Sequence, residues 1–157
     1  MELVACAEDG CLNMGTHLIT GAKKIERKNG VKFMQTPGLN HTILTISDVT
    51  KSRAFYGDLL GFDTKDIADG FVFTVGGVYF FFFPSNHPIP DDRFNEFRIG
   101  LDHLSFAAPD EDALHTLAAT LKGTGVETQG VETYHTGNKY VAFRDPDNIQ
   151  LEYWLPK

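Results

Sequence analysis

The chain of 157 residues contains only two cysteines and no long apolar run. Two thiols, Cys6 and Cys11, are too few for a disulfide framework, so the composition favours the reducing cytoplasm. A membrane-spanning helix needs about 18 or more consecutive apolar residues, and the sequence has no such run. We therefore expect neither a disulfide-stapled fold nor a membrane protein.

Positive charge is also scarce. The chain has 14 Lys and Arg residues against 21 Asp and Glu residues, and its formal net charge is −7. No block of basic residues forms a stripe, so neither nucleic acid nor an anionic membrane surface is expected as a partner. A small anionic substrate is still possible, because single arginines can act locally. These are Arg53, Arg93, Arg98 and Arg144.

The first 36 residues of the chain differ from the rest. Residues 1–36 show no sustained period of 2 or 3.6, and strongly patterned sequence begins directly after Pro37-Gly38. We predict a loosely ordered extension over 1–36 and a single domain over 37–157, which is long enough to bury a core. The domain divides into module one (37–84), a connection (85–100) and module two (101–157).

The domain repeats one pattern twice. Each half opens with a strand-like run and continues with an amphipathic helix that follows an aspartate, Asp48 or Asp110. Three shorter strand-like runs follow each helix. The fold class predicted is α+β, with two tandem βαβββ modules that form a cupped, barrel-like mixed sheet with helices outside. The expected strands cover 39–46, 64–67, 71–75, 78–83, 101–108, 127–134, 140–143 and 149–155, and the expected helices cover 49–60 and 111–122.

Two histidines and a glutamate occupy matching places in this repeat. His41 and His103 are each third in the opening run of their module, and Glu152 lies in an otherwise apolar last strand. Alternate residues of a strand share a face, so all three side chains are expected on the face opposite the helices. Single strand histidines are usually structural, but two equivalent ones with a carboxylate suit a divalent metal. Fe(II) or Mn(II) is favoured, with Zn(II) or Ni(II) as alternatives.

Aromatic residues are expected to line the same open face. Tyr79, Phe81 and Phe83 alternate along one strand, and Trp154 follows Glu152 on its own face. With Ser105 and Gln150 they would form a substrate pocket for a flat or apolar molecule. An alternative is that the run of four phenylalanines is simply a strand buried on both sides.

Three strings of the sequence resemble a known superfamily. LNHTILTISDVTKSRAFYGDLLGF, GLDHLSFAAPD and YVAFRDPDNIQLEYW are similar to the glyoxalase, bleomycin-resistance and extradiol-dioxygenase proteins, also called vicinal oxygen chelate proteins. The resemblance covers residues 38–157. It implies that each module supplies half of a cupped sheet and that the first and last strands carry the metal ligands. His41, His103 and Glu152 stand at three of the four ligand positions, and Phe81 stands at the fourth.

The missing fourth ligand favours the three-ligand branches of that superfamily. The resemblance implies a metal-dependent, dioxygenase-like enzyme acting on a small oxygen-chelating aromatic substrate, with His135 and Tyr140 as candidate acid–base residues. The alternatives are a metal-dependent lyase, isomerase or thiol transferase, and a metal-free drug-binding resistance protein. A homodimer is expected from the resemblance. The sequence leaves open whether the site lies within one chain or between two that exchange modules.

Overall fold

The structure is a computed structural model that describes residues 37–157, and residues 38–157 form one compact unit. The extension expected over 1–36 and both cysteines lie outside the described residues. Within the described part, no helix has the length and apolar character to cross a membrane.

Module one has the predicted βαβββ order. Strand β1 (His41–Ile46) leads into α1 (Val49–Arg53), which continues as the π-helical segment η1 (Ala54–Leu59). Three strands follow, β2 (Lys65–Ile67), β3 (Gly70–Val75) and β4 (Val78–Pro84), and they complete a four-stranded sheet in the order β1-β4-β3-β2. Strand β1 is parallel to β4, and the other pairs are antiparallel.

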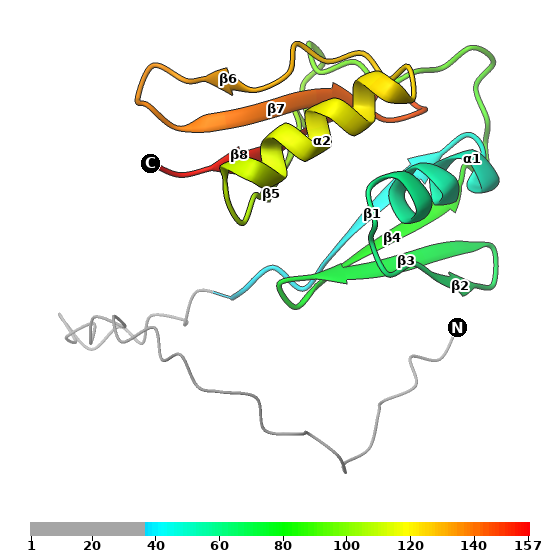
Figure 1. Cartoon of the computed structure of the whole chain (residues 1–157). Helices are drawn as coiled ribbons and strands as arrows, with labels where there is room; N and C mark the ends of the chain where they lie inside the picture. Colours follow the sequence, from blue (N-terminus) through cyan, green and yellow to red (C-terminus); the bar gives the residue numbers. More distant parts are fainter. Residues whose placement is uncertain (1–36) are drawn as a thin grey trace, which may run out of the picture. The chain divides into compact units, whose positions relative to one another are not determined.

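Module two repeats this order. It consists of β5 (Leu104–Ala107), α2 (Glu111–Gly123), β6 (Glu132–Thr133), β7 (Lys139–Arg144) and β8 (Gln150–Leu155). The sheet order is β5-β8-β7-β6 (Figure 1). The prediction of a strand over 127–134 was too long, because only Glu132 and Thr133 pair with β7. The opening strand was also overextended, since His103 lies just before β5.

Local sequence explains where the helices and the first hairpin begin and end. The side chains of Asp48 and Asp110 accept hydrogen bonds from Lys51 N and Ala113 N, as expected of N-caps. The turn between β3 and β4 has positive φ at both Gly76 and Gly77 (56° and 81°), a backbone that joins two antiparallel strands tightly. The predicted helix and hairpin are therefore confirmed.

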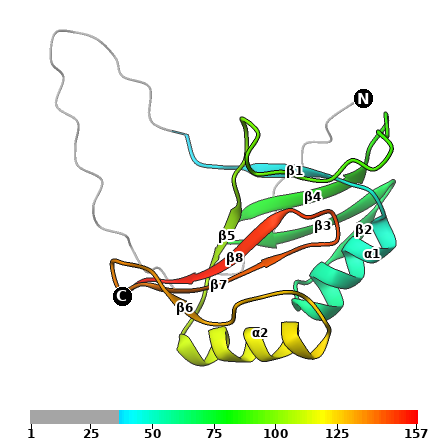
Figure 2. The same cartoon turned by 90° about the horizontal axis from the view of Figure 1, so that it is seen from above.

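One core joins the two modules. The helix-facing side of each sheet is apolar, and rings from these two sides contact each other in the core, while both helices lie at one side of the sheets (Figure 2). Phe106 of β5 contacts Phe62 and Phe80 of module one, with ring centroids 5.2 and 5.5 Å apart. Phe55 of η1 reaches Phe143 of β7 at 6.2 Å. Burial of each such ring contributes about 2 kcal/mol, so the modules stabilise one another.

The shared core turns the two open faces of the sheets away from each other. On the first sheet, β1 alternates between buried Leu44 and Ile46 and exposed His41, Ile43 and Thr45. The helices cover one face of each sheet, as predicted, and a single chain keeps two separate four-stranded sheets in place of a closed barrel. The connection binds the turn between β7 and β8 before it enters β5.

The turn between β7 and β8 links the modules through polar contacts. The Tyr56 hydroxyl donates to Asp145 Oδ2 at 2.9 Å, while Asp147 N and Ile149 N donate to Asp145 Oδ1. Ser47 N, at the end of β1, donates to both Asp147 carboxylate oxygens at 3.1 and 3.2 Å. A single turn of module two thereby binds both β1 and η1 of module one.

A carboxyl group in this turn makes the stability of the folded protein depend on pH. Burial raises the pKa of Asp145 to about 6 from an ordinary 3.8, and its hydrogen-bond donors only partly oppose the shift. The folded protein therefore holds this proton more tightly than the unfolded chain does. The stabilisation is present below about pH 4 and is lost as the pH rises through about 6.

We predict that the wild type loses more stability than Asp145→Asn as the pH rises. The difference between their free energies of unfolding, wild type minus variant, should fall by roughly 2–3 kcal/mol between pH 4 and pH 7. Urea unfolding at a series of pH values measures this difference. Asp112→Asn, an exposed aspartate of α2, is the matched control and should show no such trend. A difference that rises with pH would contradict the assignment.

Candidate functional site

The structure brings two of the three predicted metal ligands together on the second sheet. His103, immediately before β5, places Nε2 3.4 Å from Oε1 of Glu152, in the middle of β8. The Glu152 side chain is only 12% exposed, and the His103 side chain is 36% exposed. His103 Nδ1 lies 2.6 Å from Asp102 Oδ1, and the other ring nitrogen, Nε2, is directed at the Glu152 carboxylate.

The spacing of this pair is compatible with two donors to one divalent ion. Two donor atoms bound at about 2.1 Å to one ion lie roughly 3.0–3.4 Å apart. The separation of Nε2 and Oε1 falls at the upper end of that range. An imidazole nitrogen and a carboxylate oxygen are also donors that first-row divalent ions accept. The residues present therefore fit a metal.

His41 lies on the other sheet. Its Nδ1 is 2.9 Å from Asn40 Oδ1, and its ring meets Phe81 edge-on with centroids 5.9 Å apart. Over residues 37–157 of one chain, no group of three His, Cys, Asp or Glu side chains is close enough to share a metal ion. A single chain thus presents one half-site with two ligands and a second with one.

The strand register relates the two half-sites. Ser105 pairs with Glu152 across β5 and β8, and Ile43, its counterpart in module one, pairs with Phe81 across β1 and β4. Phe81 therefore occupies the position in module one that Glu152 occupies in module two. Its ring cannot bind a metal, which leaves His41 as the one ligand residue of that half-site.

The predicted aromatic side chains form a ladder on the open face of the first sheet. Tyr79 and Phe81 stack with centroids 6.0 Å apart, and Phe81 and Phe83 stack at 6.2 Å with nearly parallel rings. Phe80 and Phe82, which alternate with them, are buried in the core. The run of phenylalanines thus serves both faces of one strand, and the ladder leaves a flat apolar surface beside His41.

The remaining predicted pocket residues lie on the second sheet. Gln150 and Trp154 flank Glu152 on β8, and Ser105 is its cross-strand neighbour. Tyr140 pairs with Trp154 and stacks on it with centroids 5.9 Å apart. Partial burial, followed by Glu132 and Glu152, raises the pKa of Tyr140, so its hydroxyl keeps its proton near neutral pH.

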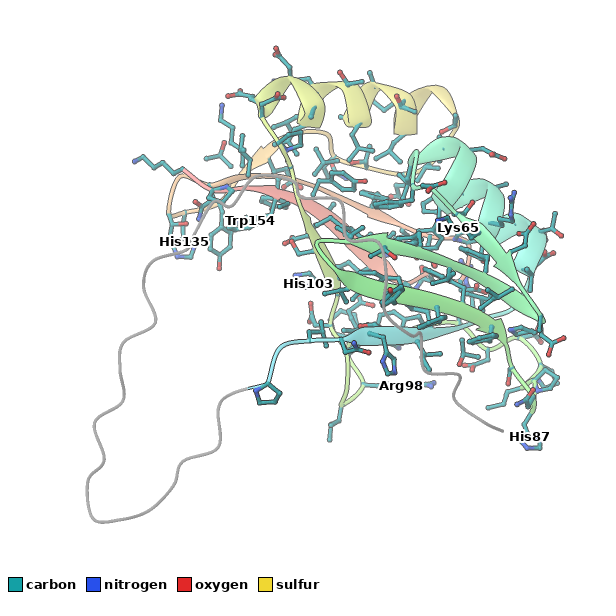
Figure 3. All side chains as sticks on the ribbon, turned by 90° about the horizontal axis from the view of Figure 1, so that it is seen from below. Lys65, His87, Arg98, His103, His135 and Trp154 are labelled. Atoms are coloured by element: carbon teal, nitrogen blue, oxygen red, sulfur yellow. The ribbon has the colours of Figure 1, made fainter. Side chains whose placement is uncertain are left out.

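His135 is placed differently from Tyr140. It lies in the exposed turn between β6 and β7, where its ring contacts Tyr134 at 4.1 Å. Figure 3 shows His135 close to Trp154 at one end of the second sheet, with His103 apart from both. Of the two candidate acid–base residues, Tyr140 is the one whose surroundings include Glu152.

The sequence analysis missed a clamp between the connection and the second sheet. Arg144 of β7 shares the face of Glu152, and its guanidinium forms a bidentate ion pair with Glu96, one bond being 3.0 Å. This pairing lowers the pKa of Glu96 to about 2. Two further bonds hold the connection to the same turn, Phe94 N to Asp147 O and Asn148 Nδ2 to Phe94 O. The signal in the sequence was only that Arg144 alternates with Ala142 toward the open face.

The clamped connection borders an open cavity at the end of the first sheet. The cavity has a volume of about 370 Å³, and its walls include Thr45, Ser85, His87, Arg93 and Arg98. A second hollow, of about 520 Å³, shares three of these residues and extends over Ile43 and Phe83. Small-molecule space therefore continues from the aromatic ladder to the connection.

Comparisons with known proteins agree with this architecture. Residues 38–153 match the family described as the Glyoxalase/Bleomycin resistance protein/Dioxygenase superfamily. YaeR of Escherichia coli (strain K12) is 31% identical over 130 residues, covering 74% of this chain and 94% of YaeR. YwkD of Bacillus subtilis (strain 168) is 28% identical over 132 residues, 77% of this chain and 98% of YwkD.

A solved structure shares the fold. The crystal structure of a glyoxylase/bleomycin resistance protein/dioxygenase domain from Frankia sp. EAN1pec is 27% identical, with a TM-score of 0.63. The similarity covers 78% of this chain and 100% of that one. The α+β prediction with two repeated modules is confirmed.

We predict that Glu96→Gln loosens the connection, because the substitution removes the charge that pairs with Arg144. Trypsin should then cleave after Arg93 or Arg98 several-fold faster than in the wild type, as followed by mass spectrometry under native conditions. Asp92→Asn removes an exposed negative charge from the same segment and is the control. Equal cleavage rates for wild type and Glu96→Gln would show that the clamp does not restrain the connection.

Proposed function

Because the chain belongs to the glyoxalase, bleomycin resistance and dioxygenase superfamily, we propose that it is a metal-dependent enzyme. Its substrate would be a small molecule that binds the ion through two of its oxygens. The observation that carries this proposal is the spacing of 3.4 Å between His103 Nε2 and Glu152 Oε1. A carboxylate that is 12% exposed is stabilised by a cationic partner, and a divalent ion would provide one.

The third ligand in this proposal is His41 of a second copy of the chain. The two open faces of one chain point apart, so its own His41 does not join its own His103 and Glu152. The open face of the first sheet also exposes large apolar side chains, Ile43 at 58% and Tyr79 at 46%. Strands β1 and β5 are each the edge of their sheet. A homodimer would cover this surface and complete two equivalent sites.

A bound divalent ion would supply a Lewis acid with open positions for two substrate oxygens. Glu152 and the two histidines would hold it, with Fe(II) or Mn(II) favoured and Zn(II) or Ni(II) as alternatives. The ladder of Tyr79, Phe81 and Phe83 would stack against a flat, apolar part of the substrate and exclude water from it. The protonated Tyr140 hydroxyl would donate a hydrogen bond to a substrate oxygen that gains negative charge.

The reaction we propose first is dioxygen-dependent cleavage of an aromatic diol. The proposed site combines metal ligands, which would leave room for two diol oxygens on the ion, with a wall of aromatic side chains. Metal-dependent lyase, isomerase or thiol-transferase chemistry would use the same ligands without dioxygen. A specific observation favours a further candidate, which is metal-free binding of an aromatic drug or metabolite. Phe81 fills a ligand position and extends the stacking surface across it.

We predict that the purified wild type carries about one divalent ion per chain and that His41→Ala and Glu152→Ala each lose it. Heterodimers of these two variants, isolated with two affinity tags, should recover about one ion per dimer. In such a dimer one site combines His41 of the Glu152→Ala chain with His103 and Glu152 of the other. Elemental analysis measures the stoichiometry. Absence of recovery would place the site within one chain, and a metal-free wild type would contradict the metal proposal.

We also predict that protein loaded with Fe(II) consumes dioxygen when catechol is added. Tyr140→Phe should slow this uptake about tenfold or more, with its iron content unchanged, because a positioned proton donor is lost. An oxygen electrode follows the uptake, and the Glu152→Ala variant is the control without metal. Lack of uptake, together with catechol binding that survives chelation, would favour the metal-free binding protein.

A further inference from the structure

Both candidate histidines are held in the same way by the residue that precedes them. The Asp102 carboxylate oxygen lies 2.6 Å from His103 Nδ1, and the Asn40 amide oxygen lies 2.9 Å from His41 Nδ1. Neighbours within a strand point to opposite faces, so such a contact needs a residue at or before the start of the strand. Asn40 and Asp102 both meet this condition, since β1 begins at His41 and β5 at Leu104.

This contact decides which ring nitrogen carries the proton. A neutral imidazole has one N–H and one lone pair, and a carboxylate oxygen can only accept a hydrogen bond. An oxygen beside Nδ1 therefore stabilises the tautomer with hydrogen on Nδ1, which leaves the lone pair on Nε2. In module two Nε2 also lies 3.4 Å from Glu152 Oε1, but Asp102 Oδ1 is closer to the ring, at 2.6 Å from Nδ1, so the proton is expected on Nδ1. Both rings thus present Nε2 as their donor atom.

The two modules use different acceptors for this purpose. Asp102 carries a negative charge, whereas Asn40 is neutral. Hydrogen bonding to a carboxylate makes an imidazole a stronger donor than bonding to an amide does. His103 would therefore bind an ion more strongly than His41, and the half-site with two ligands would also hold the supporting charge. The Asp102 side chain is 71% exposed, so its removal would not disturb the core.

We propose that Asp102 and Asn40 are positioning residues that hold His103 and His41 as Nδ1–H tautomers with Nε2 free to bind a ligand. Their purpose rests on the metal site proposed above, but the tautomer itself is a property of the metal-free protein. The two claims can therefore be tested separately.

The first measurement is nitrogen NMR of the histidine rings in metal-free protein at a pH where the rings are neutral. His103 and His41 should show the Nδ1–H tautomer in the wild type. Asp102→Ala should shift His103 toward the Nε2–H form that predominates in free histidine, while Asp102→Asn, which keeps an oxygen acceptor, should largely preserve it. Asn40→Ala should likewise shift His41 toward the Nε2–H form, whereas Asn40→Asp should keep His41 in the Nδ1–H form.

The second measurement is the affinity for Zn(II) and Mn(II), by competition with a chromophoric chelator. Loss of a supporting group of this kind costs about 10- to 100-fold in metal affinity, and we expect Asp102→Ala to fall in that range. Asp102→Asn should lose less, and the exposed Asp112→Ala, which removes the same charge elsewhere, should bind as the wild type does. Equal thermal unfolding of all variants confirms that the fold is intact.

The outcomes separate the two proposals. An Nε2–H tautomer in the wild type, or metal affinity of Asp102→Ala within twofold of the wild type, would overturn the positioning role while leaving the metal site standing. Tautomers that respond as expected, in a protein that binds no ion, would support the positioning role and overturn the metal site.

Discussion

The packing of both helix-covered faces into one core is the constraint from which the rest of this structure follows. Phe106 lies against rings of module one, and Phe55 lies against Phe143 of β7. Each module therefore buries its helix-covered apolar face against the other module. Once these faces are buried together, the opposite faces must point apart. The separation of His41 from His103 and Glu152 is a consequence of core packing, and the homodimer proposed above would supply His41 from a second chain.

Polar contacts reinforce this arrangement at one turn. Asp145 and Asp147 accept hydrogen bonds from Tyr56 and Ser47 of module one. Phe94 and Glu96 of the connection form hydrogen bonds next to them. The turn is also the link between β7, which carries Arg144, and β8, which carries Glu152. The orientation of the modules, the course of the connection and the position of the carboxylate therefore depend on the same few residues.

Much of this fold could be predicted because strand alternation and helix caps are local. The equivalence of Phe81 and Glu152 follows from counting residues in two similar modules, and the strand register confirms it. The strand expected over 127–134 failed for a tertiary reason, because Thr128 Oγ1 bonds the carbonyl of Ala142 and Gly130 adopts a positive φ of 88°. The apolar and β-branched residues of this segment pack against the core without pairing as a strand.

The relation between the two half-sites was beyond local reasoning. A pattern of alternating residues shows which face of a strand is apolar, but it does not show what covers that face. The same sequence is compatible with two modules packed around one cup or with two packed back to back. The clamp of Arg144 and Glu96 was missed for a similar reason, since the two residues are far apart in the sequence and only the folded connection joins them.

The back-to-back arrangement has a consequence for how such a protein would behave in a cell. If each complete site needs two chains, then dilution alone would abolish metal binding, without any change in either chain. The concentration of complete sites would rise with the square of the monomer concentration while the monomer predominates. Expression level would then act as a threshold, and a chain defective in one module could still serve a partner defective in the other.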